Sequence, residues 1–206
     1  MMRAVSILLL LCATGCELVF TLREPADAGL DVPPPDVVDA PDLRKVIFVT
    51  STLHRGDFGG LDAADVICQG LAGRANLGGQ FVAWLSDDNV SASSRMSMIG
   101  GYRTTTGITI STTYADFIDG SLDHPIDADE NGQPAPDTGT TCIGGVWTSS
   151  GADGAKANMG SCDNWLTSLS GEKAVAGSTQ FDNLGWTASC LFASCDETLS
   201  LYCVEQ

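Results

Sequence analysis

Three short apolar stretches of the chain predict β-strands. Residues 46–51 (VIFVTS) are mostly β-branched and aromatic, which is typical of a buried strand. Residues 81–86 (FVAWLS) predict a second strand of the same kind. Residues 199–205 (LSLYCVE) alternate with a period of two, so we expect Leu201 and Cys203 to lie on one face of a third strand.

Residues 61–72 (LDAADVICQGLA) have the pattern of a helix with one apolar side. The apolar residues that recur at helical spacing are Leu61, Ala64, Cys68, Leu71 and Ala72. We therefore expect Cys68 to face the core. The middle of the chain is rich in Gly, Ser, Thr and Asp, with short apolar islands such as Val146-Trp147. Together these patterns predict a loop-rich α+β domain over residues 45–206.

The first 16 residues have the pattern of an export signal. Arg3 precedes an apolar run of about nine residues, which is shorter than the roughly 20 residues that a membrane-spanning helix needs. Small residues then lead to Cys16, and this order resembles a bacterial lipoprotein signal. The resemblance implies that residues 1–15 are a signal peptide, that Cys16 is acylated, and that Glu17 after it favours the outer membrane. The alternative is an ordinary secretory signal whose cysteine is accidental.

Residues 16–44 are predicted to form a tether between the lipid and the domain. Within them, residues 24–42 contain five of the eight prolines and six acidic residues, without helical or alternating periodicity. Such a segment cannot bury a core, and proline favours an extended backbone. The tether is therefore expected to act as an extended spacer.

The charge of the chain excludes one class of partner. There are 10 Lys and Arg residues against 26 Asp and Glu, a formal net charge of −16. Nucleic acids and anionic lipids require a basic surface, so unaided binding to either is not expected. The membrane contact that we expect is the N-terminal lipid.

Cysteine usage indicates an oxidising compartment. The chain has eight cysteines, and the six in the predicted domain are Cys68, Cys142, Cys162, Cys190, Cys195 and Cys203. An even number in an exported domain predicts three disulfide bonds, for which 15 pairings are possible.

The order of several short motifs resembles an endostatin domain. Residues 60–68 (GLDAADVIC) and 79–86 (GQFVAWLS) are similar to its first half. Val146-Trp147, residues 162–165 (CDNW) and the spacing from Cys195 to Cys203 are similar to its second half. The same motifs occur in bacterial lipoproteins of unknown function with an endostatin-like domain.

The resemblance implies a C-type-lectin-like fold in which the terminal strands pair. It also implies bonds between Cys68 and Cys203 and between Cys162 and Cys195, which leaves Cys142 and Cys190 for a third. The zinc, heparin and sugar-binding motifs of these relatives do not transfer. The domain is acidic, and its only histidines, His54 and His124, stand alone in the sequence.

The strongest metal-binding signal lies in residues 127–132 (DADENG). Alternate side chains at Asp127, Asp129 and Asn131 could meet at one calcium ion, with Asp137 close enough to contribute. Gly132 would permit the sharp turn of such a loop. The alternative is an acidic, turn-rich surface loop without a metal.

Two further features have structural explanations. Residues 55–57 (RGD) spell an integrin-recognition tripeptide, but we expect them to form a turn after the first strand. The four tryptophans, Trp84, Trp147, Trp165 and Trp186, are expected in the core, with one or two as alternative candidates for the wall of a groove.

No catalytic signature accompanies these features. The chain lacks a Gly-x-Ser-x-Gly nucleophile elbow and a His-Glu-x-x-His motif, and oxidised cysteines offer no thiolate. We therefore predict a non-enzymatic surface lipoprotein that binds a glycan or protein ligand, with calcium as a candidate cofactor. The alternatives are a structural envelope lipoprotein without an external ligand, and a cryptic hydrolase.

Overall fold

The computed structural model describes residue 42 and residues 44–206, which belong to a compact unit spanning residues 41–206. The predicted signal peptide, Cys16 and the predicted tether up to residue 41 lie outside the described residues. The last tether residue, Arg44, is described, and its guanidinium group donates a hydrogen bond to the hydroxyl of Thr109. The described residues Asp42 and Arg44 of the predicted tether therefore both contact the domain, Asp42 through an ion pair with Arg103.

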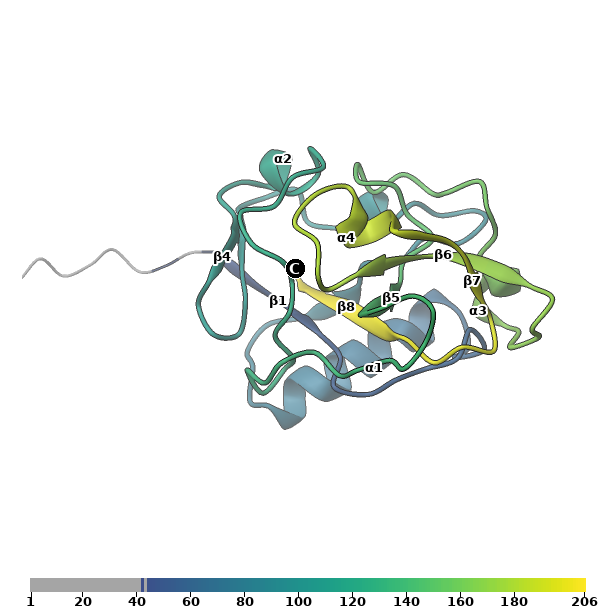
Figure 1. The fold of residues 1–206 in the computed structure, drawn as a ribbon. Helices are drawn as coiled ribbons and strands as arrows, with labels where there is room; N and C mark the ends of the chain where they lie inside the picture. The colour runs from purple at the N-terminus through teal and green to yellow at the C-terminus, as the bar shows by residue number, and fades with distance from the viewer. Residues whose placement is uncertain (1–41, 43) are drawn as a thin grey trace, which may run out of the picture. The chain divides into compact units, whose positions relative to one another are not determined.

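Four helices, a 3₁₀ turn and an eight-stranded sheet make up the described part of the chain (Figure 1). The strands are β1 (Lys45–Val49), β2 (Phe81–Ala83), β3 (Tyr102–Arg103), β4 (Thr109–Ser111), β5 (Gly145–Trp147), β6 (Lys173–Ser178), β7 (Cys190–Ser194) and β8 (Ser200–Glu205). The helices are α1 (Leu61–Arg74), α2 (Tyr114–Phe117), α3 (Cys162–Trp165) and α4 (Gly185–Ala188), and the 3₁₀ turn η1 is Ala92–Arg95. The mixed architecture is compatible with the predicted α+β class.

Strand β8 is the centre of the sheet. The strand order is β4-β3-β1-β8-β5-β6-β7, and β2 also pairs with β8. The first strand of the domain, β1, runs antiparallel to β8, which places the two ends of the domain side by side (Figure 1). Strand β5 pairs in parallel with the first residues of β8, and β2 pairs antiparallel with the last residues of β8. The predicted terminal strands therefore form the core of one sheet.

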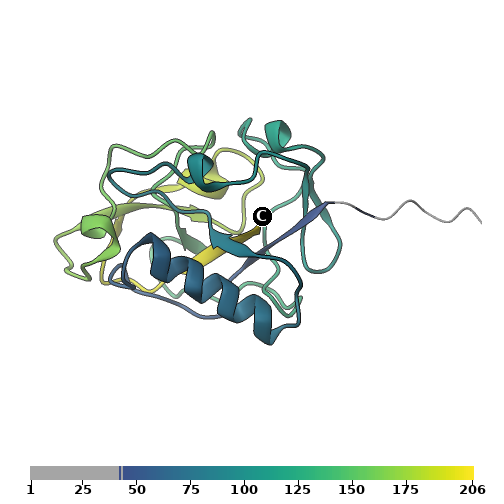
Figure 2. The same ribbon diagram turned by 180° about the vertical axis from the view of Figure 1, so that it is seen from behind.

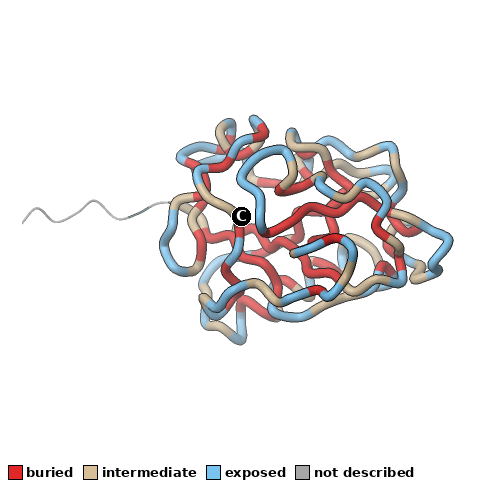
Figure 3. Tube along the Cα trace, in the orientation of Figure 1, coloured by how far each residue is buried: buried red, intermediate tan, exposed pale blue. Residues whose placement is uncertain are grey.

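Both faces of the central strands are buried, in two separate hydrophobic clusters. On one side, Phe48, Leu201 and Cys203 pack in the cluster that includes α1. On the other side, Ile47 and Tyr202 pack with the aromatic residues near α2 and α4. The alternation explains why residues 46–49 are apolar without a break, and it confirms that Leu201 and Cys203 share a face. Figure 2 shows α1 lying across the first of these faces, and Figure 3 shows the central strands buried.

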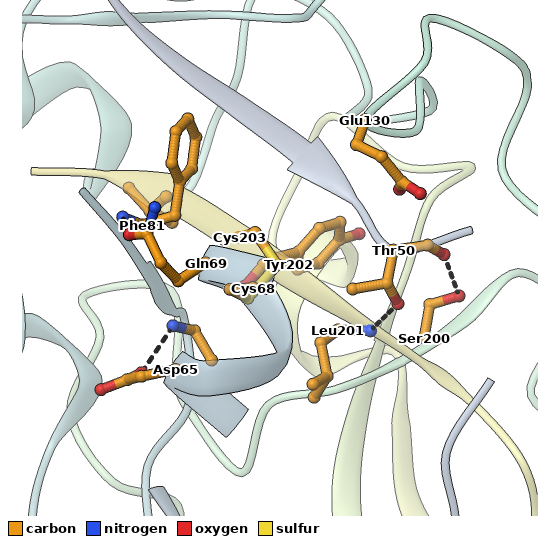
Figure 4. The surroundings of a disulfide bond; sticks show 12 residues. Thr50, Asp65, Cys68, Gln69, Phe81, Glu130, Ser200, Leu201, Tyr202 and Cys203 are labelled. Atoms are coloured by element: carbon orange, nitrogen blue, oxygen red, sulfur yellow. Dashed lines mark hydrogen bonds between the residues drawn. A yellow bond between two sulfur atoms is a disulfide. The ribbon is translucent and has the colours of Figure 1, made fainter. Parts of the chain in front are cut away.

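Three disulfide bonds join the six cysteines of the domain. They connect Cys68 to Cys203, Cys142 to Cys190 and Cys162 to Cys195. These are the pairs named above. The first bond links α1 to β8 in the middle of the core, and Figure 4 shows its surroundings. Cys68 is fully buried, as its helical spacing predicted.

All four tryptophans are fully buried. The core prediction is therefore confirmed, and none of them lines a groove. Three indole N–H groups donate hydrogen bonds: that of Trp84 to the Thr187 hydroxyl, that of Trp147 to the His54 carbonyl and that of Trp165 to the Ser86 carbonyl. These bonds satisfy the polar edge of a large apolar side chain in the interior.

Helix α3 is a single left-handed turn. All four of its residues have positive φ, from 51° at Cys162 to 65° at Trp165. Each non-glycine residue in this conformation costs about 1–2 kcal/mol, so packing must hold the turn in place. The Cys162–Cys195 bond fixes its start, and Trp165 stacks on Phe58 with ring centroids 5.2 Å apart.

Candidate functional site

The segment of residues 125–135 folds into a small hairpin. Ala128 and Pro134 form an antiparallel bridge, and the Ala135 N–H donates to the Asp127 carbonyl at 2.7 Å. Gly132, at the tip, has a φ of 73°, which a glycine adopts without strain. Gly132 therefore allows the chain to reverse at the tip of this hairpin.

Two buried acidic residues hold this hairpin in shape. One carboxylate oxygen of Asp129, Oδ1, accepts hydrogen bonds of 2.8 Å from the backbone N–H groups of Asn131 and Gln133. The Glu130 carboxylate accepts from the Ser51 N–H at 3.0 Å and from the Ser51 hydroxyl. Both acidic residues are about 5% exposed, and hydrogen bonds to ionised groups are among the stronger ones.

The same hairpin is fixed to the end of β1. The Val49 N–H donates to the Ala128 carbonyl at 3.0 Å, and Val49 and Asp129 form a parallel bridge. Figure 4 shows Glu130 beside Thr50, where β1 ends. The hairpin is therefore held at several points by the central sheet.

An open groove of about 530 Å³ lies along the hairpin. Its lining residues come from three segments of the chain: Thr106 and Ile108; Pro125, Asp127, Ala128, Gly132, Gln133, Pro134 and Ala135; and Thr179 and Gln180. We call this depression the hairpin groove. Its volume is in the range of small-molecule sites, and its lining combines amides, hydroxyls and a carboxylate with apolar surfaces.

The structure does not bring the three acidic residues among the predicted calcium ligands, Asp127, Asp129 and Asp137, together as one group. Among residues 42 and 44–206, no group of three or more His, Cys, Asp or Glu side chains is placed to hold a metal ion. Asp129 Oδ1 accepts hydrogen bonds from the backbone of the same turn. The exposed Asp137 accepts a hydrogen bond from the Gly139 N–H at 3.0 Å. Asp127 is exposed and lines the groove. Calcium binding by this segment stays a prediction, beside the alternative of an acidic, turn-rich loop without a metal.

Comparison of the chain with protein-family models and with curated protein sequences gives no match. No helix in the described part of the chain is both long and apolar enough to span a membrane.

The two histidines are held by separate neighbours. The backbone of His54 exchanges hydrogen bonds with Leu199, and its Nε2 lies 2.9 Å from the Thr52 hydroxyl. Burial lowers the pKa of His54. His124 Nδ1 lies 2.7 Å from the Pro125 carbonyl and 3.9 Å from Asp127 Oδ1, at the border of the hairpin groove.

The Arg-Gly-Asp tripeptide of residues 55–57 leads into a turn after β1, which confirms the expectation. Gly56 is buried, and a Cβ atom there would lie 2.5 Å from Cys162 Sγ. The Asp57 carboxylate accepts a hydrogen bond of 2.9 Å from the Ser168 hydroxyl. The glycine therefore serves the close approach of the backbone to a disulfide bond.

Sequence reasoning identified only part of the hairpin groove. It singled out Asp127 and Gly132, but it gave no role to Thr106, Ile108, Thr179 or Gln180. These four lie in segments far from residue 127 in the sequence, and no motif marks them. Only the folding of the sheet brings these segments to the hairpin.

Proposed function

We propose that this protein is a non-enzymatic surface lipoprotein whose domain binds a glycan in the hairpin groove. The observation that carries the proposal is a ligand-sized groove built on a hairpin that buried carboxylates hold rigid. A preorganised site loses little conformational entropy on binding, which favours affinity for a small ligand.

The lining chemistry favours a glycan over a protein ligand. The exposed amides of Gln133 and Gln180 can both donate and accept hydrogen bonds, as sugar hydroxyls require. The apolar surfaces of Ile108 and Pro134 are suited to the C–H faces of a sugar ring. Protein interfaces are usually anchored by aromatic or arginine side chains, and the groove lining has neither.

We also propose that the fold is C-type-lectin-like. Two features support this assignment: the pairing of the terminal strands β1 and β8, and the disulfide bonds Cys68–Cys203 and Cys162–Cys195. Both are what the resemblance to endostatin-like lipoproteins implies. In this proposal the module is carried on the outer membrane by acylated Cys16 and an extended tether.

Substitution of the groove amides tests the binding proposal. The full chain with Cys16→Ser, which cannot be acylated, is applied to an array of defined bacterial oligosaccharides. We expect saturable binding to at least one of them, and a loss of at least tenfold in affinity in the double variant Gln133→Ala, Gln180→Ala, because each lost hydrogen bond contributes about 1 kcal/mol.

The matched control is Asn158→Ala, which removes an exposed amide from a different depression of the surface. It should leave affinity unchanged. No saturable binding to any oligosaccharide would instead favour the structural envelope protein. Equal losses in the control and the double variant would refute the hairpin groove as the site.

Metabolic labelling tests the lipid anchor. Cells that express the chain are grown with radioactive palmitate, and the protein is expected to carry label and to sediment with the outer membrane. Cys16→Ser should lose the label and leave the membrane fraction, because each buried methylene of the acyl chains contributes about 0.8 kcal/mol to anchoring. Cys12→Ser, inside the predicted signal peptide, is the control and should keep both properties.

A further inference from the structure

Strand β7 forms an unpaired edge of the sheet within the described residues. It pairs with β6 and stands at the end of the strand order opposite β4 (Figure 1). The Cys195 N–H bonds to the Glu172 carbonyl on the β6 side. Because antiparallel pairing alternates, the backbone N–H and C=O groups of Phe192 and the N–H group of Ser194 point away from β6, while the Ser194 carbonyl accepts from the Glu197 N–H at 2.8 Å. Edge strands of this kind can accept another strand.

Apolar side chains surround this edge. Phe192 is 66% exposed and Leu191 is 44% exposed, and β7 contains no charged residue. Ile143 and Phe181, also exposed, flank a depression of about 230 Å³ at the start of β7, beside the Cys142–Cys190 bond. We call Ile143, Phe181, Leu191 and Phe192, together with the outer edge of β7, the β7 surface. Natural proteins usually protect an exposed strand edge with charged residues or proline, and this strand has neither.

The rim of the β7 surface is acidic. Asp182 follows Phe181, Asp196 follows β7 and accepts from the Ser194 hydroxyl at 2.6 Å, and Glu172 lies opposite the end of β7. The one basic residue on the neighbouring strand, Lys173, donates its ammonium group to the Ser170 carbonyl at 3.0 Å. Two copies of this chain would place like charges against each other, whereas a basic partner would be attracted.

We propose that the β7 surface binds an extended segment of another protein that has an apolar centre and basic ends, and that this segment adds a strand to β7. Main-chain hydrogen bonds supply the general affinity of such pairing, and side-chain pockets supply the specificity. The depression beside Cys190 would take one apolar side chain of the segment, and the acidic rim would pair with its Lys or Arg residues. The depression shares Gln180 with the hairpin groove, whereas Ile143, Phe181, Leu191 and Phe192 do not line that groove.

Three synthetic peptides test the proposal. Each is fluorescently labelled and titrated with the full chain carrying Cys16→Ser: a peptide of alternating Val and Thr with two Lys at each end, the same core with Glu at the ends, and the Lys peptide with N-methylated backbone amides. We expect saturable binding of the first peptide and affinities at least tenfold weaker for the other two. Salt at 0.5 M should weaken the first interaction, because it screens the rim charges.

The variant Leu191→Thr, Phe192→Thr keeps β-propensity and removes the apolar side chains. It should bind the Lys peptide at least fivefold more weakly. The control Val66→Thr changes an apolar residue on α1 that is 72% exposed, and it should bind normally. Near-UV circular dichroism establishes that both variants are folded.

Several results would overturn the proposal. Equal affinity for the Lys and Glu peptides would show that the acidic rim does not select basic ends. Unchanged affinity of the N-methylated peptide would exclude strand addition. Unchanged affinity of the Leu191→Thr, Phe192→Thr variant would exclude the β7 surface. Sedimentation showing a dimer that the same variant dissociates would identify a second copy of the chain as the occupant instead.

Discussion

Removal of the Cys68–Cys203 disulfide is expected to lower the free energy of unfolding by about 5 kcal/mol. The bond closes a sequence separation of 135 residues and joins α1 to the central strand β8. A crosslink over so long a loop restricts the unfolded chain strongly, which is the main source of its stabilisation in the loop-entropy model. The measurement is urea denaturation of the double variant Cys68→Ala, Cys203→Ala against the unmodified domain.

The matched control is Cys142→Ala, Cys190→Ala, which opens a separation of 48 residues at a less buried site. It should cost about 1 kcal/mol less, because the closed loop is shorter. A loss below about 1 kcal/mol in the first variant would contradict the prediction. Peptide mapping under non-reducing conditions checks the pairing itself, and a Cys195–Cys203 peptide would refute the fold.

The substitution Gly177→Ala is expected to lower the free energy of unfolding by about 3 kcal/mol. Gly177 lies in β6, where α4 crosses the strand closely. A Cβ atom there would lie 2.0 Å from the Trp186 carbonyl oxygen and 2.7 Å from the Thr187 Cα atom. Both are backbone atoms, so a rotamer change cannot relieve the clash, and α4 has to move away from the sheet. Thermal and urea unfolding measure the loss.

Gly73→Ala provides the opposite control. Gly73 lies in α1, and a Cβ atom there would meet nothing within 4 Å. This variant is expected to stabilise the protein by about 0.5–1 kcal/mol, because alanine has the higher helix propensity. If both variants had equal effects, then the contact between β6 and α4 would not be as close as described.

The candidate site shows where sequence reasoning was limited. Residues 127–132 have the composition of a calcium loop, yet Asp129 uses its carboxylate to bond the backbone of its own turn. Aspartate, asparagine and glycine favour such turns through local hydrogen bonds and backbone freedom. The same residues therefore fit both a calcium-binding loop and a turn without a metal. The sequence alone could not decide between them. Glu130 is buried against Ser51, which lies 79 residues away in the sequence. No local sequence pattern could therefore predict this contact.

The local patterns did predict the elements that form the centre of the domain. Periodicity placed a helix at residues 61–72 and a strand at residues 199–205, and the structure has α1 at Leu61–Arg74 and β8 at Ser200–Glu205. The continuous apolar run of β1 indicated a buried strand, and its two buried faces account for that run. Short elements such as β3, β4 and α2 were not predicted, because two to four residues carry too little periodicity.

What the sequence determined by itself is therefore local: the period of the apolar residues, the acidic charge, the six domain cysteines and the strand or helix that each period favours. The tertiary structure alone decided the left-handed turn at Cys162–Trp165, the three segments that meet at the hairpin groove and the place of β7 at the edge of the described sheet. The physical reason is that these features depend on packing and pairing between residues far apart in the chain. Such contacts can outweigh local preference, as the burial of Trp165 does for a turn that non-glycine residues otherwise avoid.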